Sequence, residues 1–310
     1  MKQFMLSAVL LVATLFGGAP GWGAETAVPK VVVSIKPIHA LVSGVMQGVG
    51  EPVLLVKGGG SPHGYVLRPS EARALAGADL IVWIGPQLES FLEKSLSTLG
   101  RNATQLKLIE ELRVDLLPAR KGGSWEDHGE GHEGHHGDDR GLNRHLWFSP
   151  RLAQQVVGSC VEALSRLDPG RSQIYAANAA RVKARLGDLH ERLERKLSPV
   201  RSVPYIVFHD AYQYFEAAYN LNAVGSISVD PERRPGVKRI LDIREKIKTL
   251  QARCVFSEPQ FEPQLVQAII EGTDAGVATL DPLGIDLPAG LESYFTLLDG
   301  LADSLISGLQ

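Results

Sequence analysis

Residues 168–198 have the sequence D-P-G-R-S-Q-I-Y-A-A-N-A-A-R-V-K-A-R-L-G-D-L-H-E-R-L-E-R-K-L-S, and this stretch decides how the rest of the chain is arranged. Asp168-Pro169 is typical of the start of a helix. Apolar residues then recur at steps of three or four, and Arg, Lys and Glu fill the other faces. The recurring residues are Val182, Leu186, Leu189, Leu193 and Leu197. A helix of roughly 28 residues is about 42 Å long, which exceeds the width of a small domain.

Such a long helix has two interpretations: half of a coiled coil, or a rigid rod between two lobes. The second is favoured because alternating strands and helices are predicted on both sides of it. We therefore expect an N-terminal lobe over residues 25–167, a linking helix over 168–198 and a C-terminal lobe over 199–310. A length of 310 residues is compatible with two domains.

Short apolar runs predict the strands of both lobes. In the first lobe these runs are 31–35, 52–56, 79–84 and 106–109; in the second they are 205–208, 223–229, 254–257 and 276–280. Helical patterns separate them, and strands that alternate with helices form mostly parallel sheets. The predicted fold class is α/β, with helices on both faces of each sheet and one long rigid helix between the lobes.

Composition and the N-terminus restrict the function. A net charge of -3 and a pI near 6.3 argue against a nucleic-acid partner. Lys2, the apolar run 4–16 and the break at 17–20 are typical of a secretory signal peptide over residues 1–24, cleaved near Ala24. The run is too short to cross a bilayer, and no cysteine follows it that could carry a lipid. We expect an exported protein without a membrane anchor.

The two cysteines, Cys160 and Cys254, lie in different halves of the chain and in differently patterned segments. Export permits a disulfide, but this placement favours two free, buried thiols. Neither belongs to a C-x-x-C motif, so we expect no thiolate metal site.

A loop over residues 118–143 contains four histidines among glycines and acids. They are His128, His132, His135 and His136. Such a segment cannot bury enough apolar surface to offset its loss of conformational entropy, so we expect it to be mobile. Clustered imidazoles predict weak auxiliary metal binding. The alternative is a solvated linker whose histidines are incidental.

Four other side chains form a candidate metal site. His63 lies in the loop after 52–56, His145 opens an apolar run, His209 ends 205–208, and Asp281 ends 276–280. Ligands of open α/β sheets bind outside the carboxyl ends of the strands. Three imidazoles and one carboxylate suit zinc. A single histidine at a strand end is more often structural, so the pattern alone leaves the site open.

A family resemblance strengthens this hypothesis. The motifs are G-G-G-S-P-H63-G-Y-V-L-R-P-S, R-H145-L-W-F-S-P, F-H209-D-A-Y-Q-Y-F-E, F-S-E-P-Q-F and T-L-D281-P-L-G. Together they resemble the metal-binding substrate-binding proteins of ABC transporters, and most closely the ZnuA-type zinc-binding family. The resemblance implies two α/β lobes, a metal in the cleft between them, and zinc ligands at His63, His145 and His209. Manganese-binding relatives typically carry a glutamate where this chain has His209.

The same resemblance leaves the fourth ligand open. Some ZnuA-type proteins have a glutamate just before the first histidine, whereas this chain has Pro62. Asp281 and a water molecule are the remaining alternatives, and Asp281 is the one that we favour. Glu258 and Trp147 belong to the family-like motifs, and we assign them no ligand role.

The predicted function is capture of Zn²⁺ in the periplasm and its delivery to an ABC permease, by a monomer without enzymatic activity. One alternative is a binding protein of a manganese or iron ABC importer. Another is a secreted zinc-dependent hydrolase, since three histidines plus water are also a catalytic arrangement. No H-E-x-x-H motif stands on a predicted helix to support it: the one match, His132 to His136, lies in the glycine-rich loop.

Overall fold

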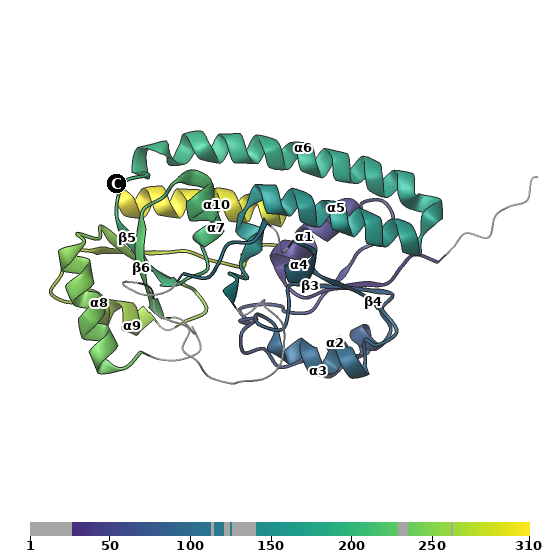
Figure 1. The fold of residues 1–310 in the computed structure, drawn as a ribbon, viewed down its shortest axis with the longest axis horizontal. Coiled ribbons are helices and arrows are strands. Elements are labelled where there is room, and N and C mark those ends of the chain that lie inside the picture. The colour runs from purple at the N-terminus through teal and green to yellow at the C-terminus, as the bar shows by residue number, and fades with distance from the viewer. Residues whose placement is uncertain (1–26, 113–114, 121–124, 126–140, 229–234, 262) are drawn as a thin grey trace, which may run out of the picture.

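The computed structural model describes residues 27–112, 115–120, 125, 141–228, 235–261 and 263–310 (Figure 1). Within these residues the strands form two four-stranded sheets, in the orders β2-β1-β3-β4 and β6-β5-β7-β8, and every strand pair is parallel. The strands are β1 (Val31–Val33), β2 (Val53–Leu54), β3 (Leu80–Trp83), β4 (Thr104–Lys107), β5 (Tyr205–His209), β6 (Ala223–Ser228), β7 (Cys254–Ser257) and β8 (Gly276–Thr279). The predicted α/β fold of two lobes is confirmed.

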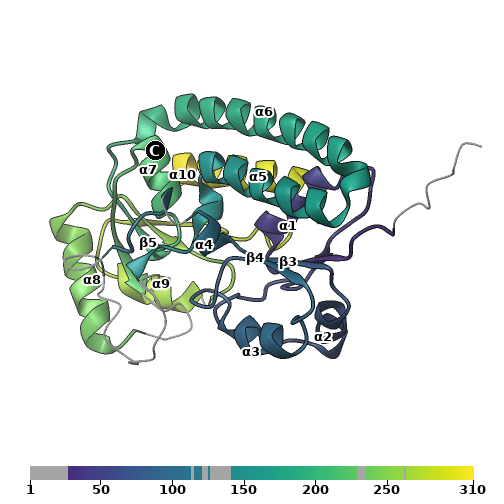
Figure 2. The same ribbon diagram turned by 45° about the vertical axis from the view of Figure 1, so that its right-hand side comes forward.

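The described helices cover both faces of the two sheets. They are α1 (Lys36–Val45), α2 (Pro69–Ala76), α3 (Ser90–Thr98), α4 (Leu108–Glu111), α5 (Pro150–Leu167), α6 (Ser172–Leu197), α7 (Gln213–Tyr219), α8 (Val237–Thr249), α9 (Pro263–Ile270) and α10 (Glu292–Leu309). Figures 1 and 2 show α5, α6 and α10 on one side of the sheets, and α2, α3, α8 and α9 on the other.

Alternation along the strands explains this layering. Val31 and Val33 of β1 belong to the large core beneath α1, α5 and α6, whereas Val32 packs in a separate cluster with Leu75 of α2 and Leu92 of α3. Successive side chains of a strand point to opposite faces. A strand buried on both faces is therefore apolar throughout, and β1 and β3 are.

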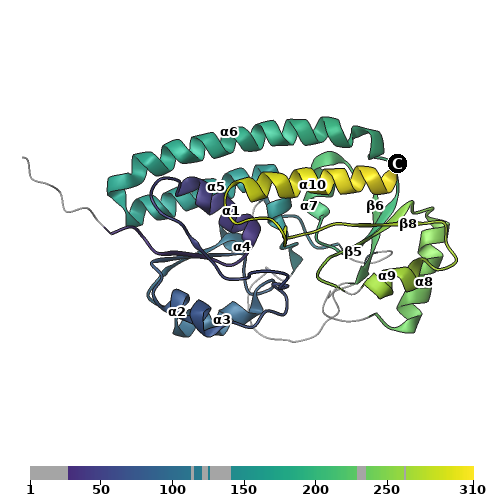
Figure 3. The same cartoon turned by 180° about the vertical axis from the view of Figure 1, so that it is seen from behind.

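The second sheet is packed in the same way. Tyr205 and Val207 of β5 join the large core, while Ile206 and Phe208 pack with α8 and α9. The large core is continuous from the first sheet to the second, because α6 and α10 contribute to it along their length (Figure 3). The two lobes thus share one apolar interior on the α6 side.

Helix α6 links the lobes as predicted, with short 3₁₀ turns η4 (Pro169–Arg171) and η5 (Ser198–Val200) at its ends. The apolar residues that predicted it are all at most 2% exposed, and they are Val182, Leu186, Leu189, Leu193 and Leu197. Arg185, Arg192 and Lys196 form ion pairs with acids of α10. The linker is therefore fixed along one side.

One strand prediction was wrong at its end. We expected a strand over 106–109, but β4 begins at Thr104 and ends at Lys107, and Leu108–Glu111 form the short helix α4. Leu108 and Ile109 are both fully buried. A short buried apolar run has no periodicity that distinguishes strand from helix.

The two cysteines, Cys160 and Cys254, are free and buried, as predicted. Burial raises the pKa of Cys160 to about 12 and that of Cys254 to about 11, so neither thiol is reactive at neutral pH.

No described helix combines the length and the apolar character that a membrane span requires. The predicted signal peptide, 1–24, lies outside the described residues.

The ends of the predicted loop 118–143 form a closed base. Pro118 and Leu142 make an antiparallel bridge, the Ala119 amide donates to the Gly141 carbonyl at 2.7 Å, and the Asn143 amide donates to the Leu117 carbonyl at 2.9 Å. The four histidines between these ends, His128, His132, His135 and His136, lie outside the described residues.

Candidate metal centre

His63 is carried by the long loop between β2 and α2. The end of this loop is held by Glu71, a buried carboxylate that accepts hydrogen bonds from the Arg68 amide and the Tyr65 hydroxyl, both at 2.8 Å. An acid at this position of a helix's first turn closes back on the residue that precedes the helix. The His63 amide donates to the Ser61 hydroxyl at 3.3 Å. These bonds fix the loop on both sides of the imidazole.

His145 precedes a buried 3₁₀ turn, η3 (Leu146–Phe148). Trp147 anchors this turn to the other lobe: its indole N–H donates to the Pro282 carbonyl at 2.9 Å, and its carbonyl accepts from the Tyr294 hydroxyl at 2.7 Å. Ser149 then caps α5 by accepting from the Leu152 amide. The backbone around His145 is thus rigid, as its apolar sequence predicts.

His209 is the last residue of β5, an interior strand of the second sheet. It is 4% exposed. Its position at the carboxyl end of a parallel strand aims it at the space between the lobes. Two histidines of the site therefore come from the N-terminal lobe and one from the C-terminal lobe.

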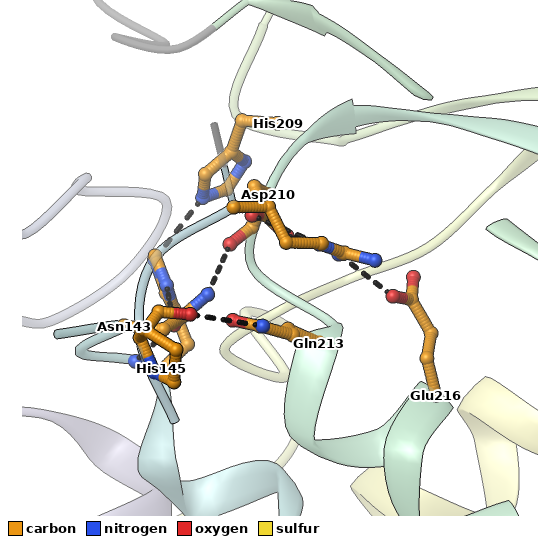
Figure 4. A network of polar contacts seen from close by, with 8 residues as sticks. Asn143, His145, His209, Asp210, Gln213 and Glu216 are labelled. Atoms are coloured by element: carbon orange, nitrogen blue, oxygen red, sulfur yellow. Dashed lines mark hydrogen bonds and ion pairs between the residues drawn. The ribbon is translucent and has the colours of Figure 1, made fainter. Parts of the chain in front are cut away.

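The three imidazoles meet. Among the described residues, His63, His145 and His209 are the one group of possible metal ligands whose ligand atoms all lie within 4.8 Å of one another. The Nε2 atoms of His145 and His209 are 3.3 Å apart, and Figure 4 shows these two rings approaching each other. The ring centroid of His63 lies 5.6 Å from the ring centroids of His145 and His209. This convergence is the central feature of the site.

Hydrogen bonds set the tautomers of two of these rings. His209 Nδ1 lies 2.7 Å from Glu258 Oε1, and His145 Nδ1 lies 3.0 Å from Asn143 Oδ1. A carboxylate or amide oxygen only accepts hydrogen bonds, so Nδ1 carries the proton in both rings. In the neutral form of each ring, the Nε2 lone pair then points toward the shared space. Metal-binding histidines are commonly oriented in this way.

Electrostatics keeps the third imidazole neutral. Burial holds the pKa of His63 well below its usual value, and the positive charges that His209 and Arg144 can carry lower it further. A neutral imidazole is the form that binds a metal. The rings border a cavity of about 20 Å³, whose other walls include the apolar residues Pro62, Trp147, Phe261 and Leu283. This volume accommodates one water-sized group.

Asp281, the fourth residue of the predicted site, is not part of this group. Its Oδ1 accepts from the amides of Leu283 and Gly284, both at 2.9 Å, and its Oδ2 accepts from the amide of Ile285 at 2.7 Å. Asp281 does not line the cavity, although the next two residues, Pro282 and Leu283, do. The structure thus brings three of the four predicted residues together, and Asp281 orders the adjoining turn.

Two contributors to the site were not assigned a role from sequence. Asn143 orients His145, and Glu258 orients His209. Glu258 lies in the motif F-S-E-P-Q-F, which marked it as notable without indicating its contact. Nothing in the local sequence distinguishes Asn143 from a surface asparagine, although its position two residues before His145 is suited to a local hydrogen bond.

Comparison with known proteins identifies the family of the chain. The family model described as zinc-uptake complex component A, periplasmic (ZnuA), matches residues 31–308. The chain belongs to the ZnuA family. A high-affinity zinc uptake system protein ZnuA of Brucella abortus is 41% identical over 325 residues and covers 97% of both chains. That of Yersinia pestis is 34% identical over 322 residues, covering 100% of this chain and 98% of its own.

Solved structures agree with this family assignment. A crystal structure of ZnuA superimposes with a TM-score of 0.77 at 26% identity, over 92% of this chain and 100% of that one. The periplasmic zinc-binding protein TroA of Treponema pallidum has a TM-score of 0.76 at 21% identity, over 91% of this chain and 99% of its own. The second likeness shows a shared fold.

The hydrogen bonds of Asp281 predict a role in stability. Asp281→Asn replaces one carboxylate oxygen by an NH₂ group that cannot accept from the facing amides, so the free energy of unfolding should fall by about 1–3 kcal/mol. Urea denaturation of the metal-free protein measures this. Asp286→Asn is the control, because Asp286 is exposed on the same segment. Equal stability of the two variants would contradict the structural role.

Proposed function

We propose that the chain captures Zn²⁺ through His63, His145 and His209 and delivers it to the permease of an ABC-type importer. The observation that carries this is the convergence of three imidazoles, contributed by both lobes, on a cavity of about 20 Å³. Membership of the ZnuA family supports the same function.

The spacing of the nitrogens suits zinc. At a Zn–N distance of 2.0–2.1 Å, two imidazole nitrogens of a tetrahedral site are about 3.3 Å apart. His145 Nε2 and His209 Nε2 are 3.3 Å apart. Imidazole also suits zinc better than manganese, which prefers oxygen ligands. The ligand type favours zinc over the manganese or iron alternatives, and the spacing is compatible with zinc.

The fourth position is open in this proposal. Asp281 already accepts hydrogen bonds from three backbone amides and does not line the cavity. We therefore propose a water molecule as the fourth ligand, in place of the carboxylate that the sequence favoured. The four histidines His128, His132, His135 and His136 are proposed as an auxiliary, weaker store of metal near the cleft.

The family and the N-terminus support a periplasmic setting. The family is periplasmic by description, and residues 1–24 have the pattern of a cleaved export signal. We propose a monomeric carrier in the periplasm that releases zinc to its permease. The small cavity supports a carrier in preference to a hydrolase, because a hydrolase must admit a substrate beside its metal.

Removal of a ligand histidine tests the site. His63→Ala, His145→Ala and His209→Ala should each weaken zinc binding by more than about 100-fold, beyond the effect of losing an outer contact. Isothermal calorimetry in competition with a chelator measures the affinity. His190→Ala is the matched control, since His190 contacts Tyr219 on α7 and lies outside the triad. Wild-type affinity in all three variants would refute the assignment.

Competition between metals tests the cargo. With three imidazole ligands, equimolar zinc should displace manganese almost completely, following the intrinsic order of affinities. Dialysis of the purified protein against both metals, followed by elemental analysis, measures the bound ratio. Retention of manganese over zinc would show that the protein belongs to a manganese importer.

Deletion of residues 126–139 tests the auxiliary site. The deletion should lower the total number of zinc ions bound and leave one tight site, because His145 and its rigid frame remain. Replacing His128, His132, His135 and His136 by asparagine is the control that keeps the length of the segment. Loss of the tight event in a zinc titration, with the circular dichroism spectrum unchanged, would mean that this segment supplies primary ligands.

A further inference from the structure

Arg120, at the base of the loop 118–143, binds the C-terminal lobe beside the metal centre. Its Nε is 3.1 Å from both carboxylate oxygens of Asp210, and its Nη2 contacts Asp210 as well. The same Nη2 lies 2.7 Å from Glu216 Oε2. One guanidinium thus joins two carboxylates of the other lobe, and Asp210 directly follows His209.

This cluster is shielded from solvent. Glu216 is 4% exposed, and burial raises its pKa to about 7, although Arg120 acts in the opposite direction. The ring of Trp125 covers the guanidinium, with its centroid 3.4 Å from the Arg120 Cζ atom. Charge-assisted bonds between groups removed from water are stronger and more directional than those on an open surface.

The turn that Arg120 holds also carries a metal ligand. Figure 4 shows Asp210 and Asn143 close to His209 and His145. The Ala211 amide donates to the His209 carbonyl at 2.8 Å, and Asn143 Nδ2 donates to the Asp210 carbonyl at 3.0 Å. Glu258 sets the rotation of the His209 ring, but the backbone from which the ring projects is set by the contacts of Asp210.

We propose that Arg120 is a positioning residue of the metal centre: by binding Asp210 and Glu216 at the same time, it fixes the backbone that follows His209 relative to His145. This inference rests on the proposed zinc function. It also gives the base of the histidine-containing loop a direct connection to the site, because Trp125 lies in that stretch and stacks on Arg120.

The geometry requires arginine. Asp210 is bound through both of its oxygens while Glu216 is bound through the same guanidinium, and a planar fork of donors can do both at once. A lysine ammonium is a point charge that reaches one carboxylate well. Charge alone is therefore insufficient, and Arg120→Lys should restore only part of the effect.

The test compares variants of the full chain in zinc affinity and in the absorption spectrum of the cobalt-substituted protein. Arg120→Met combined with Glu216→Gln removes the contacts of the guanidinium with both carboxylates and keeps the net charge of the cluster. Arg120→Lys is the conservative variant and remains informative where the double variant fails to fold. Arg185→Ala is the matched control: Arg185 also binds a carboxylate, Glu292, through both oxygens at 2.7 Å and stacks on the ring of Phe295 at 4.0 Å, but joins α6 to α10.

We expect the double variant to bind zinc about tenfold more weakly, at the lower end of the effect of outer contacts, with a shifted cobalt spectrum. Arg120→Lys should fall between it and the wild type, and Arg185→Ala should match the wild type. Wild-type affinity in the folded Arg120 variants, or weaker binding with an unchanged cobalt spectrum, would overturn the positioning role. A wild-type protein that binds zinc no better than His209→Ala would instead refute the proposed function.

Discussion

The apolar interior that α6 and α10 share with both sheets is the constraint on which the site depends. Residues of β1, β3, β5 and β7 all belong to it, so the two sheets are held at a fixed separation. The carboxyl ends of their parallel strands then lie on either side of one gap. His63 and His145 enter this gap from one lobe, and His209 enters it from the other. A metal site built in this way can be no more rigid than the core that sets the distance between its halves.

Polar contacts across the gap, together with the apolar core, fix the position of one lobe relative to the other. Trp147 donates to Pro282 and Lys36 donates to the carbonyls of Gly284, Ile285 and Leu287, while Asp281 orders the amides of the same segment. The backbone of the segment after β8 is thus held through both its N–H groups and its carbonyl groups. Each contact is local, but together they place the cavity wall at Pro282 and Leu283. Preorganised ligands lose less entropy on binding than mobile ones.

Sequence reasoning located most of this because parallel sheets obey simple rules. Strand ends and the period of α6 predicted two lobes and made His63, His145 and His209 candidates for one site, and the family resemblance then implied that they are zinc ligands. Contacts between lobes are not visible in local patterns, which is why the roles of Arg120 and Asn143 were not predicted. Asp281 shows a different limit. Its sequence D-P-L-G also matches a turn in which the aspartate accepts from the amides that follow it, and that local role competes with metal binding.

The most direct test of this account is a crystal structure of the zinc-loaded protein with anomalous data on both sides of the zinc absorption edge. The account predicts that the strongest anomalous peak lies between the three Nε2 atoms, at about 2.0–2.1 Å from each, with a water oxygen completing the tetrahedron. A strongest peak bound by the histidines of residues 126–139, or a zinc ion held by fewer than three of His63, His145 and His209, would contradict it.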